Sequence, residues 1–248
     1  MIGSIKRALL AAARRAGYEI VPIGPVYPAA NRRLTMMAHH RVKTVVDVGA
    51  NTGQYASALR QAGYKEEIFS FEPLSEAYEE LEKKSRPDPK WRVFHCAVGE
   101  ENGEAEINIA GNSESSSLLP MLDTHIRSAP ESQYRATERV KVSTLDSILE
   151  PLLSKESRVL LKIDTQGYEH HVIKGARSLL QQVHLIECEL SLTPLYEGQY
   201  LFQDMLELLN GVGFEPVHFD PVFSDLKSGH CLQVDGTFVR SSENRAPS

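Results

Sequence analysis

Residues 44–54 read TVVDVGANTGQ and constrain the fold more than any other part of the chain. The valines form the short β-branched run that a buried parallel strand needs, and Gly49 and Gly53 follow it. Glycines in such a turn can adopt positive φ and let a ligand approach the backbone. The segment therefore predicts a buried strand, a turn at the carboxyl edge of a sheet, and a helix whose free N–H groups can bind a ligand.

The glycine spacing of this turn distinguishes two cofactor classes. Nicotinamide and flavin enzymes use G-x-G-x-x-G, whereas here Ala50, Asn51 and Thr52 separate the two glycines. S-adenosylmethionine has no pyrophosphate and needs no middle glycine, and the preceding acid, Asp47, suits its cationic end. The turn favours S-adenosylmethionine over a nicotinamide-dependent oxidoreductase, while a turn of this kind that binds nothing is the structural alternative.

A second acid follows about twenty residues after the turn, where adenosyl folds place the carboxylate that binds the ribose hydroxyls. Residues 68–73 (IFSFEP) read as a strand that ends at Glu72 and is stopped by Pro73. A solvated acid at a strand end is the alternative. Residues 91–98 (WRVFHCAV) predict a third strand before Gly99, at the position where adenine would lie.

Six motifs occur in a characteristic order: VVDVGANTGQ (45–54), FSFEP (69–73), CAVGEENG (96–103), STLDSIL (143–149), LLKIDTQGYEHHVIKGA (160–176) and LQVDGTFVR (232–240). With them the chain resembles the FkbM-like family of S-adenosylmethionine-dependent methyltransferases. The resemblance implies a Rossmann-like fold and O-methylation of a hydroxyl on a sugar, glycolipid or polyketide-type product. By position it also implies which residues bind the cofactor: Asp47, Gly49, Asn51 and Gly53 at the methionine part, Glu72 at the ribose, and Cys96, Ala97 and Val98 at the adenine.

Composition indicates one α/β enzyme domain, which we expect at residues 36–240. The chain has 248 residues, of which 42% are apolar and 24% charged, so it is long enough to bury a full core. The net charge of −6 argues against a nucleic-acid partner, because phosphate binding needs a basic face. The three cysteines form no zinc spacing or disulfide framework, which predicts a reducing, cytoplasmic location.

Residues 1–35 predict an amphipathic basic helical segment, whose apolar run is too short for a signal peptide or a membrane span. We expect it to pack against the catalytic domain or cover its active site. The alternative is peripheral contact with the inner face of an anionic membrane. The polar tail, residues 241–248, is predicted to be disordered.

Residues 104–139 have an irregular pattern with several serines and two prolines, and predict a long loop that acts as a lid or contacts the substrate. Ser115 and Ser117 are the candidate substrate residues in it. A flexible surface loop is the alternative.

Asp164 is the main candidate for catalysis, because residues 158–163 read as a buried strand that delivers it to the carboxyl edge of the sheet. It could take the proton from an acceptor hydroxyl, although a carboxylate is a weak base toward an alcohol. His170, on a helix predicted at residues 168–182, and His230 are further candidates for the base. Each of these histidines could instead lie on the surface.

Glu187 and Glu189 share one face of the strand VHLIECEL (183–190) by period-two alternation. With Asp164 they could bind Mg²⁺ or another divalent cation, or they could pair with a basic residue of the substrate site. Glu189 and Asp225 are also candidates for binding substrate hydroxyls. Asp225 lies in a mixed aromatic and polar loop that would suit a sugar.

We therefore expect an α/β, Rossmann-like class I methyltransferase with a mostly parallel seven-stranded sheet and helices on both faces. The expected reaction is S-adenosylmethionine-dependent O-methylation of a sugar, glycolipid, polysaccharide or secondary metabolite. A non-catalytic module that keeps the adenosyl pocket is the alternative from another functional class. The oligomeric state stays open.

Overall fold

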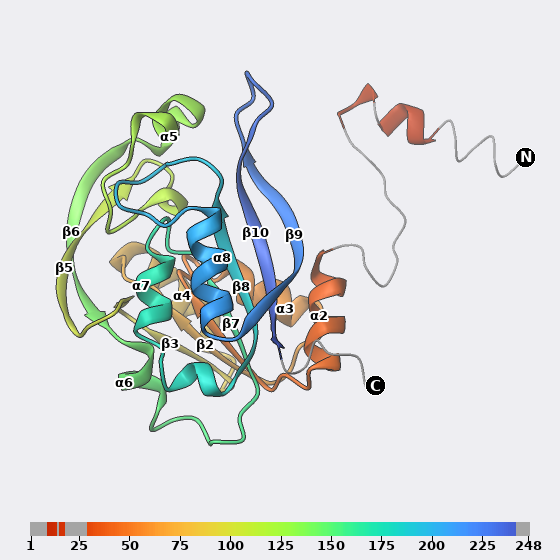
Figure 1. Cartoon of the computed structure of the whole chain (residues 1–248), viewed down its shortest axis with the longest axis vertical. Coiled ribbons are helices and arrows are strands. Elements are labelled where there is room, and N and C mark those ends of the chain that lie inside the picture. The colour runs from red at the N-terminus through yellow and green to blue at the C-terminus, as the bar shows by residue number, and fades with distance from the viewer. Residues whose placement is uncertain (1–8, 14, 18–28, 242–248) are drawn as a thin grey trace, which may run out of the picture.

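The strand β1 (Thr44–Val48) lies at the centre of a seven-stranded sheet, and all five of its residues are buried. The strand order is β3-β2-β1-β7-β8-β10-β9 (Figure 1). The first five of these strands are parallel, and β10 is antiparallel to both of its neighbours. This confirms the mostly parallel sheet. The other strands are β2 (Glu67–Phe71), β3 (Trp91–Phe94), β7 (Val159–Ile163), β8 (Val183–Ser191), β9 (Phe214–Ser224) and β10 (Cys231–Arg240).

The computed structural model describes residues 9–13, 15–17 and 29–241.

Helices cover both faces of the main sheet. Alternate residues of the central strands point to opposite faces, so each face has its own apolar cluster. The helices that pack on the first face are α6 (Leu145–Leu149), α7 (Glu169–Lys174) and α8 (Phe202–Gly211), and those on the second are α2 (Ala29–His39), α3 (Gln54–Gln61) and α4 (Ser75–Ser85).

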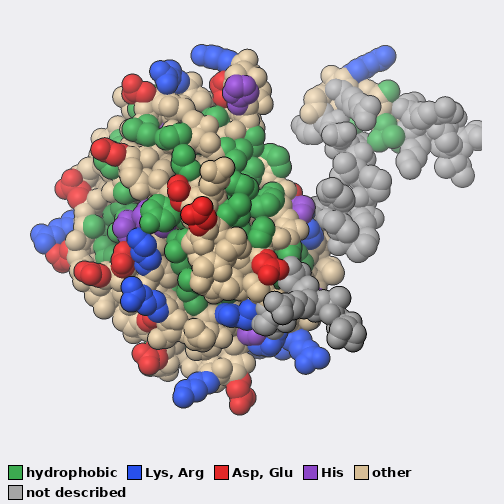
Figure 2. Space-filling model, viewed as in Figure 1, with side chains coloured by type: hydrophobic (Ala, Val, Ile, Leu, Met, Phe, Trp, Pro, Cys, Tyr) green, Lys and Arg blue, Asp and Glu red, His purple; other side chains and the backbone are tan. Residues whose placement is uncertain are grey.

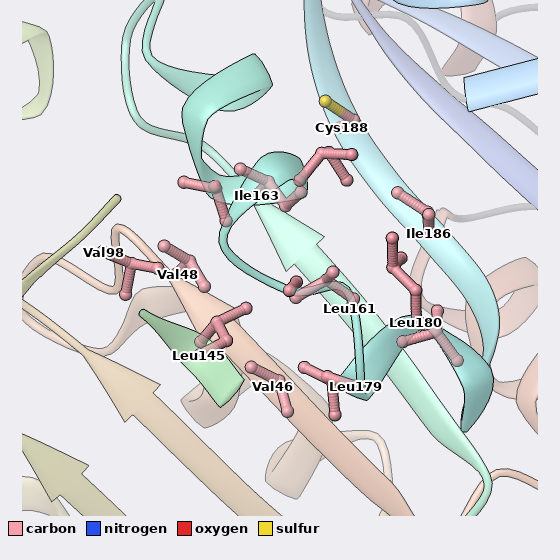
Figure 3. Close-up of a cluster of buried hydrophobic side chains, with 14 of the residues drawn as sticks. Val46, Val48, Val98, Leu145, Leu161, Ile163, Leu179, Leu180, Ile186 and Cys188 are labelled. Atoms are coloured by element: carbon pink, nitrogen blue, oxygen red, sulfur yellow. The ribbon is translucent and has the colours of Figure 1, made fainter. Parts of the chain in front are cut away.

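The core on the first face is continuous from strand to helix. Val46, Leu161 and Ile186 come from three neighbouring strands and are fully buried. Figure 3 shows them together with Leu145 and Leu180, which belong to α6 and to the 3₁₀ helix η3 (Leu179–Gln181). This packing fixes the carboxyl ends of β1, β7 and β8 at one edge of the sheet.

The expectation of a long loop at residues 104–139 is wrong at both ends. β5 (Gly103–Ala110) and β6 (Tyr134–Ser143) form an antiparallel pair, and β4 (Ala97–Val98) joins β6 to make a second, three-stranded sheet. These strands form because Ile107, Val140 and Val142 pack against the start of α4, while charged alternate residues face solvent. Residues 111–133 remain as a connection that contains η1 (Ser113–Ser115), α5 (Asp123–Ser128) and η2 (Pro130–Ser132).

Two predicted elements are divided. The helix expected at residues 168–182 breaks at Gly175, where a Cβ atom would lie 2.0 Å from the Gly99 carbonyl oxygen. The strand expected at residues 91–98 is also divided, since β3 ends at Phe94 and β4 belongs to the second sheet.

The α2 helix crosses the domain boundary expected between residues 35 and 36. Arg33 on this helix forms an ion pair with Glu187 on β8, so α2 is attached to the catalytic sheet. In the part of the chain that the structure describes, no helix is long and apolar enough to cross a membrane. The rest of the predicted basic segment, at residues 1–8, 14 and 18–28, and the tail from residue 242 lie outside the described residues.

Candidate active site

A cavity of ≈ 680 Å³ opens at the carboxyl edge of the main sheet. Its wall is built by the turn after β1, the ends of β2, β7, β8 and β10, and the connection at residues 111–133. This is the edge at which open α/β sheets bind ligands, and the volume lies within the usual range for small-molecule sites.

Glu72 lies at the end of β2, on the wall of the cavity. Its carboxylate accepts hydrogen bonds from the backbone N–H groups of Asn51, at 2.7 Å, and Leu74, at 2.9 Å. Burial raises the pKa of Glu72 to about 7, although these two bonds oppose the shift. Each carboxylate oxygen accepts one of these bonds and keeps a further lone pair, so Glu72 can still accept a hydrogen bond from a ligand hydroxyl.

The turn after β1 has the backbone conformation that its glycines predict. Gly49 has φ 75°, and a Cβ atom there would lie 1.8 Å from the Asp164 carbonyl oxygen. Asn51 also has positive φ, and both residues line the cavity. Gly53 has φ 83° but precedes α3 and faces Trp91, so it shapes the turn and does not line the cavity.

Three further predicted cofactor residues lie on the cavity wall. Cys96, Ala97 and Val98 are all buried, and they border the cavity at the start of the second sheet. Burial raises the pKa of the Cys96 thiol, so this side chain offers an apolar surface. Such a wall suits the flat face of an adenine.

Asp47 does not reach the cavity, which differs from its predicted contact with the cofactor. Its carboxylate accepts a hydrogen bond from Ser70 Oγ at 3.2 Å and pairs with Lys162 Nζ, also at 3.2 Å. Lys162 donates in turn to the Gly49 carbonyl oxygen at 3.0 Å. Asp47 therefore supports the turn from beneath.

Asp164 and Glu189 are brought together by one side-chain amide. Gln166 Nε2 donates to Asp164 Oδ1 at 2.9 Å and to Glu189 Oε2 at 3.0 Å. Gln166 Oε1 accepts a hydrogen bond from the buried Tyr196 hydroxyl at 2.7 Å, and Gln233 Nε2 donates to Glu189 at 2.7 Å. The Asp164 side chain stays 42% exposed, whereas burial, followed by the charge of Asp164, raises the pKa of Glu189 well above its ordinary value.

The metal prediction does not fit this geometry. Glu187 Oε1 and Oε2 accept hydrogen bonds from Arg33 Nε at 2.7 and 2.8 Å, and Tyr55 donates to the same carboxylate at 3.0 Å. Glu187 thus pairs with a basic residue, which was the alternative interpretation. Within residues 9–13, 15–17 and 29–241, no three His, Cys, Asp or Glu side chains are arranged to hold a metal ion.

Four other predicted residues lie away from the cavity wall. His170 is buried against Tyr200, with ring centroids 4.1 Å apart, and burial lowers its pKa to about 4. Asp225 and His230 lie in the exposed β9–β10 hairpin, where Asp225 accepts hydrogen bonds from Ser228. Ser117 donates to the Gln166 carbonyl oxygen at 2.7 Å and supports that turn. Of the two predicted serines, only Ser115 lines the cavity.

Among the side chains on the wall that the sequence did not assign to the site are His125, Gln233 and Asp235. His125 comes from α5, and burial lowers its pKa to about 4, which keeps the imidazole neutral at neutral pH. Asp235 lies opposite Glu189 in the register of β10 and β8, on the same strand face as Gln233. The alternation of LQVDGTFVR could have placed Gln233 and Asp235, but no local signal marks His125.

The sequence matches the Methyltransferase FkbM domain over residues 47–216, more than half of the chain. Among curated proteins, the 2-O-methyltransferase NoeI of Sinorhizobium fredii (strain NBRC 101917 / NGR234) is 25% identical over 185 residues. This alignment covers 72% of the present chain and 76% of NoeI.

Solved structures of two methyltransferases also resemble the chain. The Burkholderia thailandensis 1,6-didemethyltoxoflavin-N1-methyltransferase, with 1,6-didemethyltoxoflavin and S-adenosylhomocysteine bound, is 14% identical, and the match covers 87% of this chain and 77% of that chain at a TM-score of 0.47. An S-adenosylmethionine-dependent methyltransferase from Mesorhizobium loti is 10% identical, with 88% and 100% covered and a TM-score of 0.46. On its sequence match, the chain belongs to the FkbM family of S-adenosylmethionine-dependent methyltransferases.

Proposed function

We propose that this methyltransferase transfers the methyl group of S-adenosylmethionine to a hydroxyl oxygen of a sugar, glycolipid, polysaccharide or secondary metabolite. The observation that carries the proposal is the single cavity that joins Glu72, at one end, to Asp164 and Glu189 at the other. The name of NoeI, a 2-O-methyltransferase, supports oxygen as the acceptor atom.

The cofactor end of the cavity has the groups that S-adenosylmethionine needs. Glu72 accepts hydrogen bonds from the ribose hydroxyls, and the turn of Gly49 and Asn51 borders the methionine part. Residues 96–98 border the adenine. When bound, the cofactor supplies an electrophilic methyl group on a sulfonium.

At the other end, Asp164 takes the proton of the acceptor hydroxyl. With the cofactor bound, the acceptor oxygen would take the methyl carbon as the carbon–sulfur bond breaks, and the Asp164 carboxylate would accept the hydroxyl proton. Asp164 is accessible and is held in place by Gln166 and by Lys162 Nζ, 3.6 Å from Oδ2. The raised pKa of Glu189 favours a protonated carboxyl, which orients the acceptor by donating a hydrogen bond to it.

The net charge of −6 favours an acceptor other than nucleic acid. On the face shown in Figure 2, Lys and Arg side chains lie among Asp and Glu side chains. A nucleic-acid interface would gather basic residues on one face.

The function is tested by calorimetric titration with S-adenosylmethionine and S-adenosylhomocysteine, followed by methylation assays. The protein should bind both compounds and should release S-adenosylhomocysteine in the presence of hydroxylated glycosides. Methylation of amino but not hydroxyl acceptors would contradict the proposal. Binding without transfer to any acceptor would favour the non-catalytic module, and binding of NADH alone would favour the oxidoreductase.

A further inference from the structure

A second cavity of ≈ 320 Å³ adjoins the first. The two share four lining residues, Arg33, Glu187, Val222 and Asp235. The second cavity continues from this shared wall between α2 and the β9–β10 pair. Its volume lies at the lower end of the range for small-molecule sites, which is the scale of one small ring.

The floor of the second cavity is an unusually polar part of the sheet. Thr237 lies opposite Glu187 in the register of β10 and β8, and Asp235 lies opposite Asp220 on β9. Further along the same face of the sheet, the next pair of β10 and β8 is Val239 and Leu185, which is apolar and buried in the core beneath α2 and α3. Glu187 and Asp220 have partners in the protein, whereas within the described part of the chain Asp235 and Thr237 make no side-chain hydrogen bond, so these two side chains can bind a polar ligand.

The roof of the second cavity is the arginine pair of α2. Arg33 Nε donates to both carboxylate oxygens of Glu187, and the guanidinium carbon of Arg33 lies 4.6 Å from the centroid of the Tyr55 ring. Arg32 pairs with Asp220 at the far end. Both arginines are thus matched by carboxylates, and Asp235 adds a further acid. Because the acids outnumber the arginines, an anionic ligand is disfavoured, and the second cavity suits a neutral, hydroxylated ligand.

Asp235 lies at the junction of the two cavities. Asp235 is exposed and can be reached by a ligand, while the walls of the cavities partly desolvate its carboxylate. Burial, with the nearby charges of Asp164 and Glu187, raises its pKa to about 6. A carboxylate in this position can accept hydrogen bonds from hydroxyls on either side.

We propose that the acceptor is a glycoside of at least two rings. The ring that receives the methyl group lies beside Asp164 and Glu189, and the neighbouring ring occupies the second cavity. There Asp235, Thr237 and Asp220 bind its hydroxyls. This inference rests on the proposed function, since it assigns the length of the sugar acceptor.

The test compares one-ring and two-ring acceptors in the full-length protein. Methyl hexosides and methyl 6-deoxyhexosides are assayed beside methyl disaccharides that contain the same rings, with S-adenosylhomocysteine release as the readout. The wild type should show a kcat/KM at least tenfold higher for two-ring acceptors. Thr237→Leu, which fills the second cavity with apolar atoms, should reduce this ratio about tenfold, mainly through the KM of the two-ring acceptor.

The matched control is Thr137→Leu, the same change on the exposed face of β6. It should leave the ratio unchanged, and Asp220→Asn should move the ratio in the same direction as Thr237→Leu. Equal kcat/KM for the two acceptor lengths in the wild type would overturn the inference, as would an unchanged ratio in folded Thr237→Leu. If S-adenosylhomocysteine binds normally but no glycoside is methylated, the proposed sugar acceptor fails, and the two-ring inference fails with it.

Discussion

Lys162 Nζ lies 3.2 Å from Asp47 Oδ1, beneath the turn that borders the cofactor end of the cavity. Asp47 is fully buried, and burial raises its pKa, while the ammonium of Lys162 opposes that shift. Burial also disfavours the charged form of Lys162, but the carboxylates of Asp47 and Asp164 outweigh it and raise the pKa of Lys162. Each charge is therefore tolerated in the core because of the other.

Lys162→Met should lower the free energy of unfolding by about 3–5 kcal/mol, because it leaves the Asp47 carboxylate buried without a countercharge. Urea unfolding measures the change. The double variant Asp47→Leu/Lys162→Met should lose less than Lys162→Met alone. Lys43→Met, which removes an exposed partner of Glu66, is the control and should cost less than about 1 kcal/mol. Equal losses for Lys162→Met and the control would refute the role of the buried pair.

Gly49→Ala should destabilise the protein far more than Gly63→Ala. Both glycines have positive φ, so both substitutions carry backbone strain of about 1–2 kcal/mol. Only at Gly49 would the new Cβ also collide with backbone, 1.8 Å from the Asp164 carbonyl oxygen, whereas nothing lies within 4 Å at Gly63. Thermal unfolding of both variants gives the comparison. Similar melting temperatures would show that the turn and the Asp164 loop can move apart.

The sequence predicted the sheet and the cofactor turn because local signals determine both. The valines of β1, the glycines at positive φ and the acid at the end of β2 are each readable within a few residues. Residues 104–139 were misread because their strands form a separate sheet. Its apolar face is completed by α4, and polar or charged residues occupy many of the other positions of both strands, so their sequence resembles a loop.

The acceptor side of the cavity could not be assembled from sequence, because its contacts join distant segments. Arg33 and Glu187 are separated by 154 positions, and Gln233 and Glu189 by 44. The residue type predicted that Glu187 needs a partner, but only the fold shows that the partner comes from α2. His170 and His230 were plausible by chemistry alone, and helix orientation and hairpin geometry place them elsewhere.

Glu72→Ala should weaken binding of S-adenosylhomocysteine by about 1–3 kcal/mol, the usual cost of losing hydrogen bonds to a charged group. Calorimetric titration measures the dissociation constant. Glu76→Ala, on the exposed side of α4, is the control and should bind like the wild type. An unchanged dissociation constant in Glu72→Ala would remove this residue from the ribose site.

The affinity for S-adenosylhomocysteine should rise as the pH increases from 6 to 8. Burial raises the pKa of Glu72 to about 7, and the ionised carboxylate is the better acceptor for two ribose hydroxyls. Deprotonation across this window therefore strengthens binding. Glu72→Gln should flatten the pH dependence, as measured by titration at several pH values. A wild-type affinity that is constant across the window would contradict the role of the carboxylate charge.

Asp164→Asn should bind S-adenosylhomocysteine normally but turn over about 10²–10⁴-fold more slowly, the usual contribution of a general base. The amide keeps the shape of the side chain and loses the ability to take the proton. Steady-state release of S-adenosylhomocysteine gives kcat and KM. Glu189→Gln is the comparison variant and should act more on the KM of the acceptor, because Glu189 orients the hydroxyl. A normal kcat in Asp164→Asn would leave the proton to another group on the wall, such as His125.

His170→Phe should make the protein less sensitive to acid. The folded-state pKa of His170 is lowered to about 4 by burial, then by His171 and Lys174, whereas an unfolded histidine titrates near 6.5. Between these values the unfolded state binds more protons, so the free energy of unfolding falls as the pH falls through this range. Phenylalanine can keep the stacking on Tyr200 without this loss.

Urea unfolding of wild type and His170→Phe at pH 7 and pH 5 measures the effect. The loss of stability between the two pH values should be smaller in the variant by up to about 2 kcal/mol, because 1.5 pH units below the unfolded pKa correspond to that free energy. His230→Phe is the control, since that exposed side chain meets solvent in both the folded and the unfolded state. If His170→Phe loses as much stability as the wild type, burial does not keep His170 neutral in the folded protein.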